Sequence, residues 1–310
     1  MIKYLTNSEI NKDRWDDCIK NSVNGIVYAN SWYLDIVADG WSALVENDYE
    51  QVFPLISGKK WGINYLFQPV FSQQLGVFSQ TLLTEEVVAK FLKAIPPHFK
   101  FAEINLNTYN KLPQGKYQSV EWVNHELDLI NAYEKTFNGF STNLKRKIKK
   151  AEKADLSILS NIKPEEIIRI FKENKGKELK TLEEVDYQKL RRLAYMGIYK
   201  GLVNNYGVYS PKNELCAGAI FLKSKHKIIF LFSGLTAEGR ELNAMALLIS
   251  SFIKDHSQHH ITLDFEGSND PQLARFYKSF GSITSTYPHL EINNLPLFTK
   301  LAVRLAKTFW

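Results

Sequence analysis

The same order of predicted elements occurs twice along this 310-residue chain. Each copy reads as a strand, two helices, three strands, a helix and a final strand, judged from apolar periodicity and turn residues. The duplication predicts an α/β fold of two tandem domains, each with a mixed α+β sheet. The first copy is expected at 2–5, 12–21, 31–37, 42–46, 51–56, 62–67, a helix opened by Thr84, and 101–106; the second is expected at 156–159, 164–174, 183–199, 206–209, 215–222, 228–232, 241–256 and 261–265.

A strongly basic segment lies between the two copies. The stretch "STNLKRKIKKAEKADLSI" (141–158) places Leu144, Ile148 and Ala151 at helical spacing, so it predicts a helix with a narrow apolar seam and a cationic remainder. A solvated linker helix and an anion-binding helix both fit this pattern. We therefore expect an N-terminal domain at 1–135, a basic linker helix at 136–155, a C-terminal domain at 156–294 and an amphipathic helix at 295–310.

The charge and cysteine content restrict the class of protein. A net charge of +6 favours an anionic partner such as a phosphorylated ligand, RNA or an acidic membrane surface. The two cysteines, Cys18 and Cys216, are far apart, which argues against a disulfide framework or a zinc site and favours a reducing compartment. We expect no metal site, because His256, His259 and His260 lie where a helix is predicted to end, a position that suits histidine without a metal.

The sequence predicts no membrane-spanning segment. The N-terminus lacks the apolar region of a signal peptide, and the longest apolar helical stretch is too short to cross a bilayer. The C-terminal stretch "LPLFTKLAVRLAKTFW" predicts a basic amphipathic helix. Such a helix either docks on its own domain or lies on an anionic bilayer. We expect a cytoplasmic protein, either free or peripheral to the inner face of the membrane.

The stretch "LDFEGSNDPQLARFYKSFG" (263–281) runs from a strand through a glycine turn into a helix. Gly267 allows close backbone approach, and Ser268, Asn269 or Asp270 is expected to cap the helix. Arg275 and Lys278 are three residues apart and share one helical face. That face suits a phosphate or a developing oxyanion, whereas the residues by themselves favour a plain surface helix.

Three stretches carry a family resemblance: 141–158, "IIFLFSGLTAEGRELNAMALLISSFIK" (228–254) and 263–281. Together they resemble the Fem-type aminoacyl transferases that build peptidoglycan cross-bridges with a tandem pair of GNAT-type acyltransferase domains. The likeness covers the second half of the chain, and the first half is supported by element order. The helical hairpin arm that some Fem enzymes insert has no counterpart in this sequence. The family's lysine falls on Tyr277, one position before Lys278, and one residue rotates a side chain by about 100° around a helix.

The resemblance implies where a site would lie. Two neighbouring strands of this fold splay apart and the substrate lies across the gap, so Asp264, Glu266 and Gly267 are expected at its mouth. Ser233 precedes the donor loop, in which Asn243 stands where acyl-CoA enzymes carry a glycine. This departure favours aminoacyl-tRNA over acyl-CoA as the donor, with Arg146 in the basic segment contacting tRNA phosphates.

The expected reaction is attack of an amine on an activated carbonyl, which needs positioning, a proton acceptor and a stabilised oxyanion. Glu266 or Asp264 is the expected proton acceptor, and Arg275, Tyr277 and Lys278 complete the candidate catalytic set. The acceptor would be a cell-envelope precursor or another small or peptide-like amine. Two alternatives stay open: an acyl-CoA-dependent N-acetyltransferase and a non-catalytic binding protein of the same fold.

An insertion in the first copy, "FQPVFSQQLGVFSQ" (67–80), concentrates glutamines and aromatic residues. Long loops of this kind often bind ligands. An ordinary loop covering the core fits equally well. If it binds a ligand, the expected wall of an interdomain pocket consists of Tyr28, Trp32, Gln68, Gln73 and Gln74.

Overall fold

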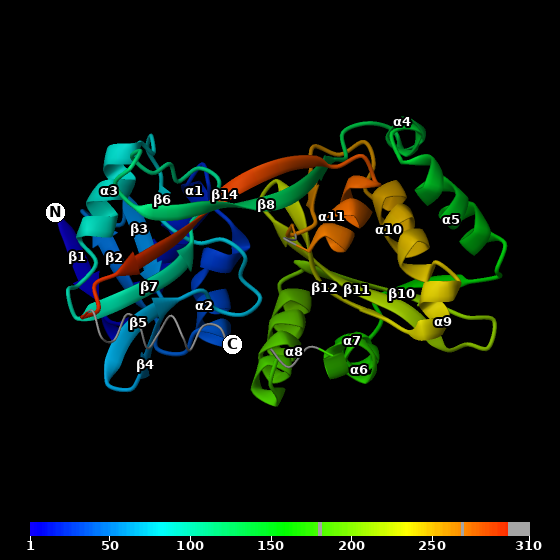
Figure 1. The fold of residues 1–310 in the computed structure, drawn as a ribbon, viewed down its shortest axis with the longest axis horizontal. Helices are drawn as coiled ribbons and strands as arrows, with labels where there is room; N and C mark the ends of the chain where they lie inside the picture. The colour runs from blue at the N-terminus through cyan, green and yellow to red at the C-terminus, as the bar shows by residue number, and fades with distance from the viewer. Residues whose placement is uncertain (179–181, 268–269, 297–310) are drawn as a thin grey trace. The chain divides into compact units, whose positions relative to one another are not determined.

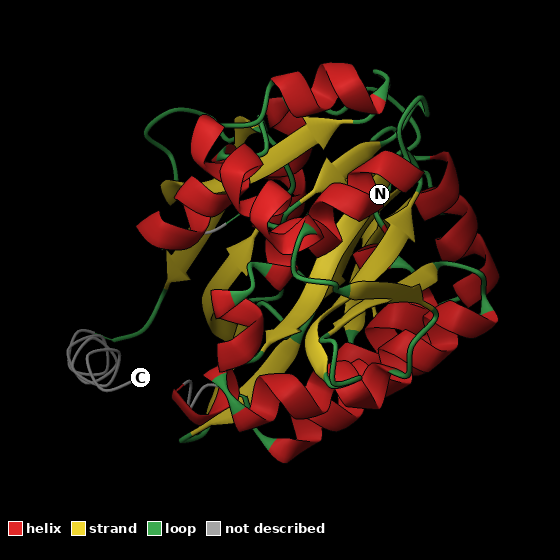
Figure 2. Cartoon of the chain, turned by 90° about the vertical axis from the view of Figure 1, so that its right-hand side faces the viewer, coloured by secondary structure: helices red, strands yellow, loops and turns green. Residues whose placement is uncertain are grey.

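The computed structural model describes residues 1–178, 182–267 and 270–296. The chain forms two compact units (Figure 1). Unit 1 comprises Met1–Trp122 and the chain from Thr286 onward, and unit 2 is Val123–Ser285. Each unit is a mixed α/β structure, and the strands are flanked by helices, coloured red in Figure 2. This division differs from the expected boundaries at 135 and 155. The basic helix at 142–152 belongs to unit 2, and the chain returns to unit 1 only after Ser285.

Unit 1 contains two groups of strands. One is an antiparallel sheet in the order β1-β2-β3-β6. The other runs β4-β5-β7-β14, with β5 and β7 parallel and the other pairs antiparallel. The elements of unit 1 are β1 (Ile2–Leu5), α1 (Lys12–Asn21), α2 (Ser31–Val37), β2 (Ser42–Glu46), β3 (Gln51–Leu55), β4 (Ser57–Lys60), β5 (Ile63–Phe67), β6 (Phe78–Ser79), α3 (Glu85–Lys93), β7 (Phe99–Asn105) and the end of β14 (Ile283–Asn293).

Local sequence explains most of these bounds. The Thr84 side chain accepts a hydrogen bond from the Val87 amide and opens α3 as predicted. The residues between the expected strands 51–56 and 62–67 are not simply a connection, since Ser57–Lys60 forms strand β4 and pairs with β5. The turn is Trp61–Gly62, where φ is +51° and +78°, so both residues adopt the left-handed conformation that a tight hairpin turn requires.

Unit 2 has one group of strands in the order β9-β10-β11-β12-β13-β8. All neighbours are antiparallel except β12 and β13, which are parallel. The elements are β8 (Gln118–Asp128, which begins in unit 1), α4 (Tyr133–Asn138), α5 (Thr142–Glu152), β9 (Ser157–Ser160), α6 (Pro164–Glu173), α7 (Lys175–Glu178), α8 (Glu184–Tyr199), β10 (Val203–Tyr209), β11 (Leu215–Ser224), β12 (Lys227–Leu235), α9 (Ala237–Glu241), α10 (Ala244–Asp255), β13 (Thr262–Asp264) and α11 (Pro271–Lys278).

Helix α6 packs on a row of glycines on one face of this sheet. Gly207, Gly218 and Gly234 are directly opposite one another on β10, β11 and β12. A Cβ atom on Gly218 would lie 2.8 Å from Ile167 Cγ1, and one on Gly234 would lie 2.7 Å from the Ile167 carbonyl oxygen. The missing side chains therefore let the helix backbone approach the strands closely.

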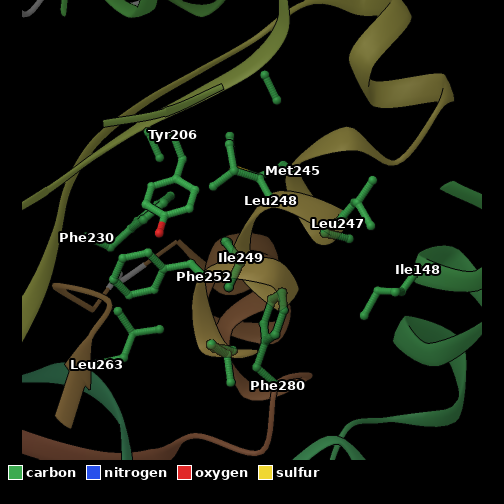
Figure 3. Close-up of a cluster of buried hydrophobic side chains, with 14 of the residues drawn as sticks. Ile148, Tyr206, Phe230, Met245, Leu247, Leu248, Ile249, Phe252, Leu263 and Phe280 are labelled. Atoms are coloured by element: carbon green, nitrogen blue, oxygen red, sulfur yellow. The ribbon is translucent and has the colours of Figure 1, made fainter. Parts of the chain in front are cut away.

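The other face of the sheet carries the main core of unit 2, formed largely by α10. Figure 3 shows Tyr206, Phe230 and Phe252 converging with Leu263 in this cluster. The rings of Phe221 and Phe252 stack at 3.6 Å between centroids. Burial of several large aromatic side chains supplies much of the hydrophobic stabilisation of the unit.

The basic helix α5 packs against α10. Its predicted seam is confirmed, because Leu144, Ile148 and Ala151 are all buried. Its exposed cations, none of which forms an ion pair with another described residue, are Arg146, Lys147, Lys149, Lys150 and Lys153. The helix therefore presents a strongly positive surface.

Two predictions concern membranes. None of the described helices is both long enough and apolar enough to cross a bilayer. The amphipathic helix expected at 295–310 falls, from residue 297 onward, outside the described residues.

Candidate functional site

The parallel strands β12 and β13 separate after a short stretch of pairing. Their ladder covers only Lys227–Ile229 on β12 and Thr262–Asp264 on β13, whereas β12 continues to Leu235. A bulge lies within the part of β12 that has left β13, since Leu231 is an extra residue in the register of β12 with β11. The strands thus part where the fold resemblance places the site, and polar side chains gather at the end of β13.

Two carboxylates lie opposite each other at this point. Glu126 on β8 is the direct cross-strand neighbour of Asp264 on β13. Two like charges in that position repel each other. The ammonium group of Lys227 bridges them, with a short contact to Glu126 Oε1 and a 3.1 Å contact to Asp264 Oδ2. Burial alone would lower the pKa of Lys227, but the two carboxylates outweigh it and raise that pKa.

Asp264 has both carboxylate oxygens engaged. Oδ2 accepts from Lys227, and Oδ1 accepts from the backbone amide of Glu266 at 2.9 Å. Its side chain is 3% exposed, whereas that of Glu126 is 17% exposed. Glu126 is therefore the more accessible of the two carboxylates.

Two neighbouring residues on β8 are fully buried and carry unpaired polar atoms. The Asn124 amide nitrogen donates to Glu126 Oε1 at 3.2 Å, but its Oδ1 has no partner among the residues that the structure describes. Within the described part of the chain, neither ring nitrogen of His125 has a partner. Burial lowers the pKa of His125, and the charge of Lys278 lowers it further. Buried polar groups without partners are rare in proteins, which makes this part of β8 unusual.

The turn after β13 is held tightly against β8. Glu266 and Gly267 both have left-handed backbones, with φ of +55° and +47°. A Cβ on Gly267 would lie 2.0 Å from the Val123 carbonyl oxygen and 2.5 Å from Asn124 Cα. The close approach expected of Gly267 is thus made to the backbone of β8, and only glycine fits there.

Helix α11 begins at Asp270, whose carboxylate accepts from the amides of Gln272 and Leu273 at 2.7 and 3.1 Å. Of the three cap candidates Asp270 fills the role, and Ser268 and Asn269 lie outside the described residues. Arg275 and Lys278 are exposed, as their shared face predicts.

Tyr277 has a different environment from its two basic neighbours on α11. It is buried, and its ring stacks on Phe265 at 4.8 Å. Burial raises the pKa of Tyr277, and the nearby charge of Glu266 adds to this effect. The hydroxyl therefore stays protonated at neutral pH.

The segment expected as a donor loop is largely helical. Thr236 caps the short helix α9 through the Gly239 amide at 3.0 Å. Asn243 supplies a left-handed residue, with φ of +58°, before α10. Ala244 at the start of α10 is fully buried, and Ser233 on β12 is half-buried.

The first-domain candidates form a separate group within unit 1. Gln68 donates to the Ser72 carbonyl at 2.6 Å and accepts from the Asn105 amide at 3.0 Å. Gln74 donates to Gln73 and accepts from the Thr108 amide. These bonds tie the 67–80 insertion to β7. Tyr28 and Trp32 both pack edge-on against Tyr33, and Arg146 lies in unit 2 on α5.

The structure brings together Asp264, Glu266, Gly267 and Tyr277, and it adds residues that the sequence reasoning missed. The missed residues are Asn124, His125, Glu126 and Lys227. The alternation of "WVNHELDL" was a usable strand signal, but nothing in it shows which strand lies opposite. Among the described residues, no three His, Cys, Asp or Glu side chains are grouped so as to hold a metal ion.

The sequence matches no family model and no curated protein. Solved structures do match. FemX aligns over 96% of this chain and 99% of its own, with a TM-score of 0.66 and 12% identity. A conserved protein of unknown function from Bacteroides thetaiotaomicron aligns over 94% and 99%, with a TM-score of 0.62 and 11% identity. L-PGS from Bacillus licheniformis aligns over 96% and 95%, with a TM-score of 0.57 and 10% identity. The chain therefore has the Fem-like, GNAT-type acyltransferase fold, as predicted.

Proposed function

We propose that this protein is an N-acyltransferase that moves an aminoacyl group from aminoacyl-tRNA to an amine. The acceptor would be a cell-envelope precursor or another small or peptide-like molecule. The observation that carries the proposal is the polar cluster at the end of β13, where two carboxylates, a lysine and buried unpaired polar groups meet beside the separating strands. Buried ionisable clusters of this kind are typical of functional sites.

Within this site we assign proton acceptance to Glu266. Asp264 suits the role less well, because both of its oxygens already accept hydrogen bonds. Arg275 and Lys278 are exposed and suit a phosphate or the developing oxyanion better than the buried Tyr277. Gly267 and Ser233 would shape the backbone around the reacting groups.

The choice of donor depends on α10 and α5. A pyrophosphate binds best at an open helix N-terminus, but Ala244 is fully buried and Asn243 replaces a glycine there. The exposed cations of α5, Arg146 among them, suit the phosphates of a tRNA. These features favour aminoacyl-tRNA over acyl-CoA. In unit 1 we propose the 67–80 insertion, with Tyr28, Trp32, Gln68, Gln73 and Gln74, as an acceptor-binding region.

A second candidate is a non-catalytic binding protein of the same fold. It is favoured by Tyr277, which stands at the position of the family's lysine and is buried. Native mass spectrometry of the purified protein separates the candidates, because bound tRNA, bound CoA or neither has a different mass.

The direct test is single-turnover transfer from a mixture of labelled aminoacyl-tRNAs to amine acceptors. We expect transfer by the wild-type chain and a loss of about 10²–10⁴-fold in Glu266→Gln, the range typical of a removed general base. The exposed Glu214→Gln, in the turn between β10 and β11, is the matched control and should transfer normally. Absence of transfer from every aminoacyl-tRNA would reject the proposal.

We also propose peripheral membrane contact through residues 295–310, which would bring the enzyme to a lipid-linked acceptor. Sedimentation with anionic liposomes tests this idea. The full chain should sediment with the lipid, and a chain lacking 295–310 should remain in the supernatant. Equal sedimentation of both chains would show that another surface binds the lipid or that contact is nonspecific.

A further inference from the structure

We infer that Glu126 and Asn124 form a recognition site for a primary ammonium group. Both lie on β8 at the end of β13, beside the turn that contains Gly267. The inference deepens the proposed function by naming the chemistry that the cluster binds. It rests on that function only for the source of the ammonium group.

The Asn124 amide has one orientation that fits its surroundings. Its nitrogen donates to Glu126 Oε1 at 3.2 Å, and a carboxylate can only accept. Its Oδ1 is then fixed as a buried acceptor to which no described residue donates. An unpaired acceptor of this kind costs about 1–3 kcal/mol, so a ligand that supplies a donor gains that energy.

Glu126 provides the second vacant acceptor. Its Oε1 receives both Asn124 and Lys227, whereas Oε2 has no hydrogen bond to any described residue. The side chain is 17% exposed, so a group from solvent can reach it. Asn124 Oδ1 is buried, so the inferred site requires a neighbouring side chain such as Glu126 to rotate when the ligand binds. The two vacant atoms are both acceptors, and they match a ligand that carries several N–H donors.

The charge of the cluster favours a cation. Glu126 and Asp264 carry two negative charges against the single positive charge of Lys227, and no other described residue forms an ion pair with either carboxylate. Lys227 itself shows that this carboxylate accepts an ammonium group. A second ammonium on Oε2 would neutralise the remaining charge, whereas a quaternary ammonium could not donate to Asn124.

Two reactants of the proposed function carry such a group. One is the α-ammonium of the aminoacyl donor, and the other is the protonated amine of the acceptor. Alanine methyl ester represents the first and n-butylammonium the second. N-acetylalanine methyl ester and tetramethylammonium are the corresponding probes without an ammonium donor.

The experiment follows the backbone amide NMR signals of Glu126 and Gly267 in the full-length chain during titration with each probe, and also the side-chain amide signal of Asn124 in chains that retain this residue. We expect saturable shifts with n-butylammonium, alanine methyl ester or both, and the tighter probe identifies the source. Glu126→Gln and Asn124→Leu should each weaken binding about tenfold, which corresponds to about 1.4 kcal/mol. Glu121→Gln, an exposed glutamate on the same strand, is the matched control and should bind like the wild type.

Three results would each overturn the inference. They are equal shifts with N-acetylalanine methyl ester or tetramethylammonium, wild-type binding by both Glu126→Gln and Asn124→Leu, and no saturable binding of either amine. A Glu126→Gln variant with a wild-type amide spectrum shows that lost binding is not lost folding. Because no donor or transfer reaction enters this assay, ammonium binding without transfer would reject the proposed function alone. Transfer without ammonium binding would reject this inference alone.

Discussion

Substitution of Gly234 by alanine tests whether α6 is seated on the glycine row. The new Cβ would lie 2.6 Å from Ile170 Cγ1, 2.7 Å from the Ile167 carbonyl oxygen and 3.0 Å from the Phe171 amide nitrogen. Ordinary contacts between such atoms begin near 3.5 Å, so the helix must move by roughly 0.5–1 Å. A shift of that size loses a quarter to a half of the dispersion energy at each displaced contact. The α6 side chains that face the sheet at this point, Ile167 and Ile170, are fully or almost fully buried.

We expect a net loss of about 2–3 kcal/mol in the free energy of unfolding. Overpacking a core typically costs about 1–3 kcal/mol, and two of the three close atoms belong to the backbone, which places this site at the upper end. The lower entropy of the unfolded alanine chain offsets about 0.4–1 kcal/mol.

Urea unfolding followed by far-UV circular dichroism measures this loss. Tryptophan fluorescence is a second probe that reports on unit 1, since Val123–Ser285 contains no tryptophan. Gly58→Ala is the control, because the new Cβ would touch only the half-exposed Tyr65 side chain. It should change stability by less than about 0.5 kcal/mol. Wild-type stability of Gly234→Ala would refute the close packing of α6 on β12.

Three further predictions follow from the charged and buried groups of unit 2. Since the pKa of His125 in the folded chain is lowered from its ordinary 6.5, the unfolded chain binds more protons than the folded chain below neutral pH. Stability should therefore fall as the pH drops through 6.5, and urea titrations of His125→Leu should show a shallower fall than those of the exposed control His226→Gln. Lys227→Met should lower the free energy of unfolding by about 3–5 kcal/mol, measured by thermal or urea unfolding, because the facing carboxylates then lack a counter-charge. The loss should shrink in acid, and a loss that does not change with pH would contradict this cause. Under the proposed function, Arg146→Glu should weaken tRNA binding and reduce its salt dependence, and an unchanged slope of affinity against salt would show that α5 does not hold tRNA phosphates.

Elements with local signals were predictable from the sequence. The helices at 12–21 and 31–37 were predicted with the bounds that they have, because apolar spacing defines both and the Asn11 side chain caps the first. Strands β8 and β14 were missed. The first half of β8 is exposed and lacks a buried alternation, and β14 contains Pro288 and few apolar residues.

The site was predictable only where one stretch of chain forms it. Asp264, Glu266 and Gly267 follow one another, and a family resemblance was enough to select them. Glu126 joins them through the register of β8 with β13, and Lys227 through the parallel pairing of β12 with β13. Such long-range pairings depend on tertiary packing, which local sequence patterns do not encode.

The discontinuous course of unit 1 has a consequence for synthesis on the ribosome. Strand β7 pairs along one edge with β14, through His289–Asn293. That partner emerges only after the whole of unit 2 has been translated. Until then the nascent chain presents an open β7 edge, which is a template for pairing with other chains. We expect the growing polypeptide to depend on chaperones during this interval, and truncation before residue 289 to yield aggregates rather than a smaller folded protein.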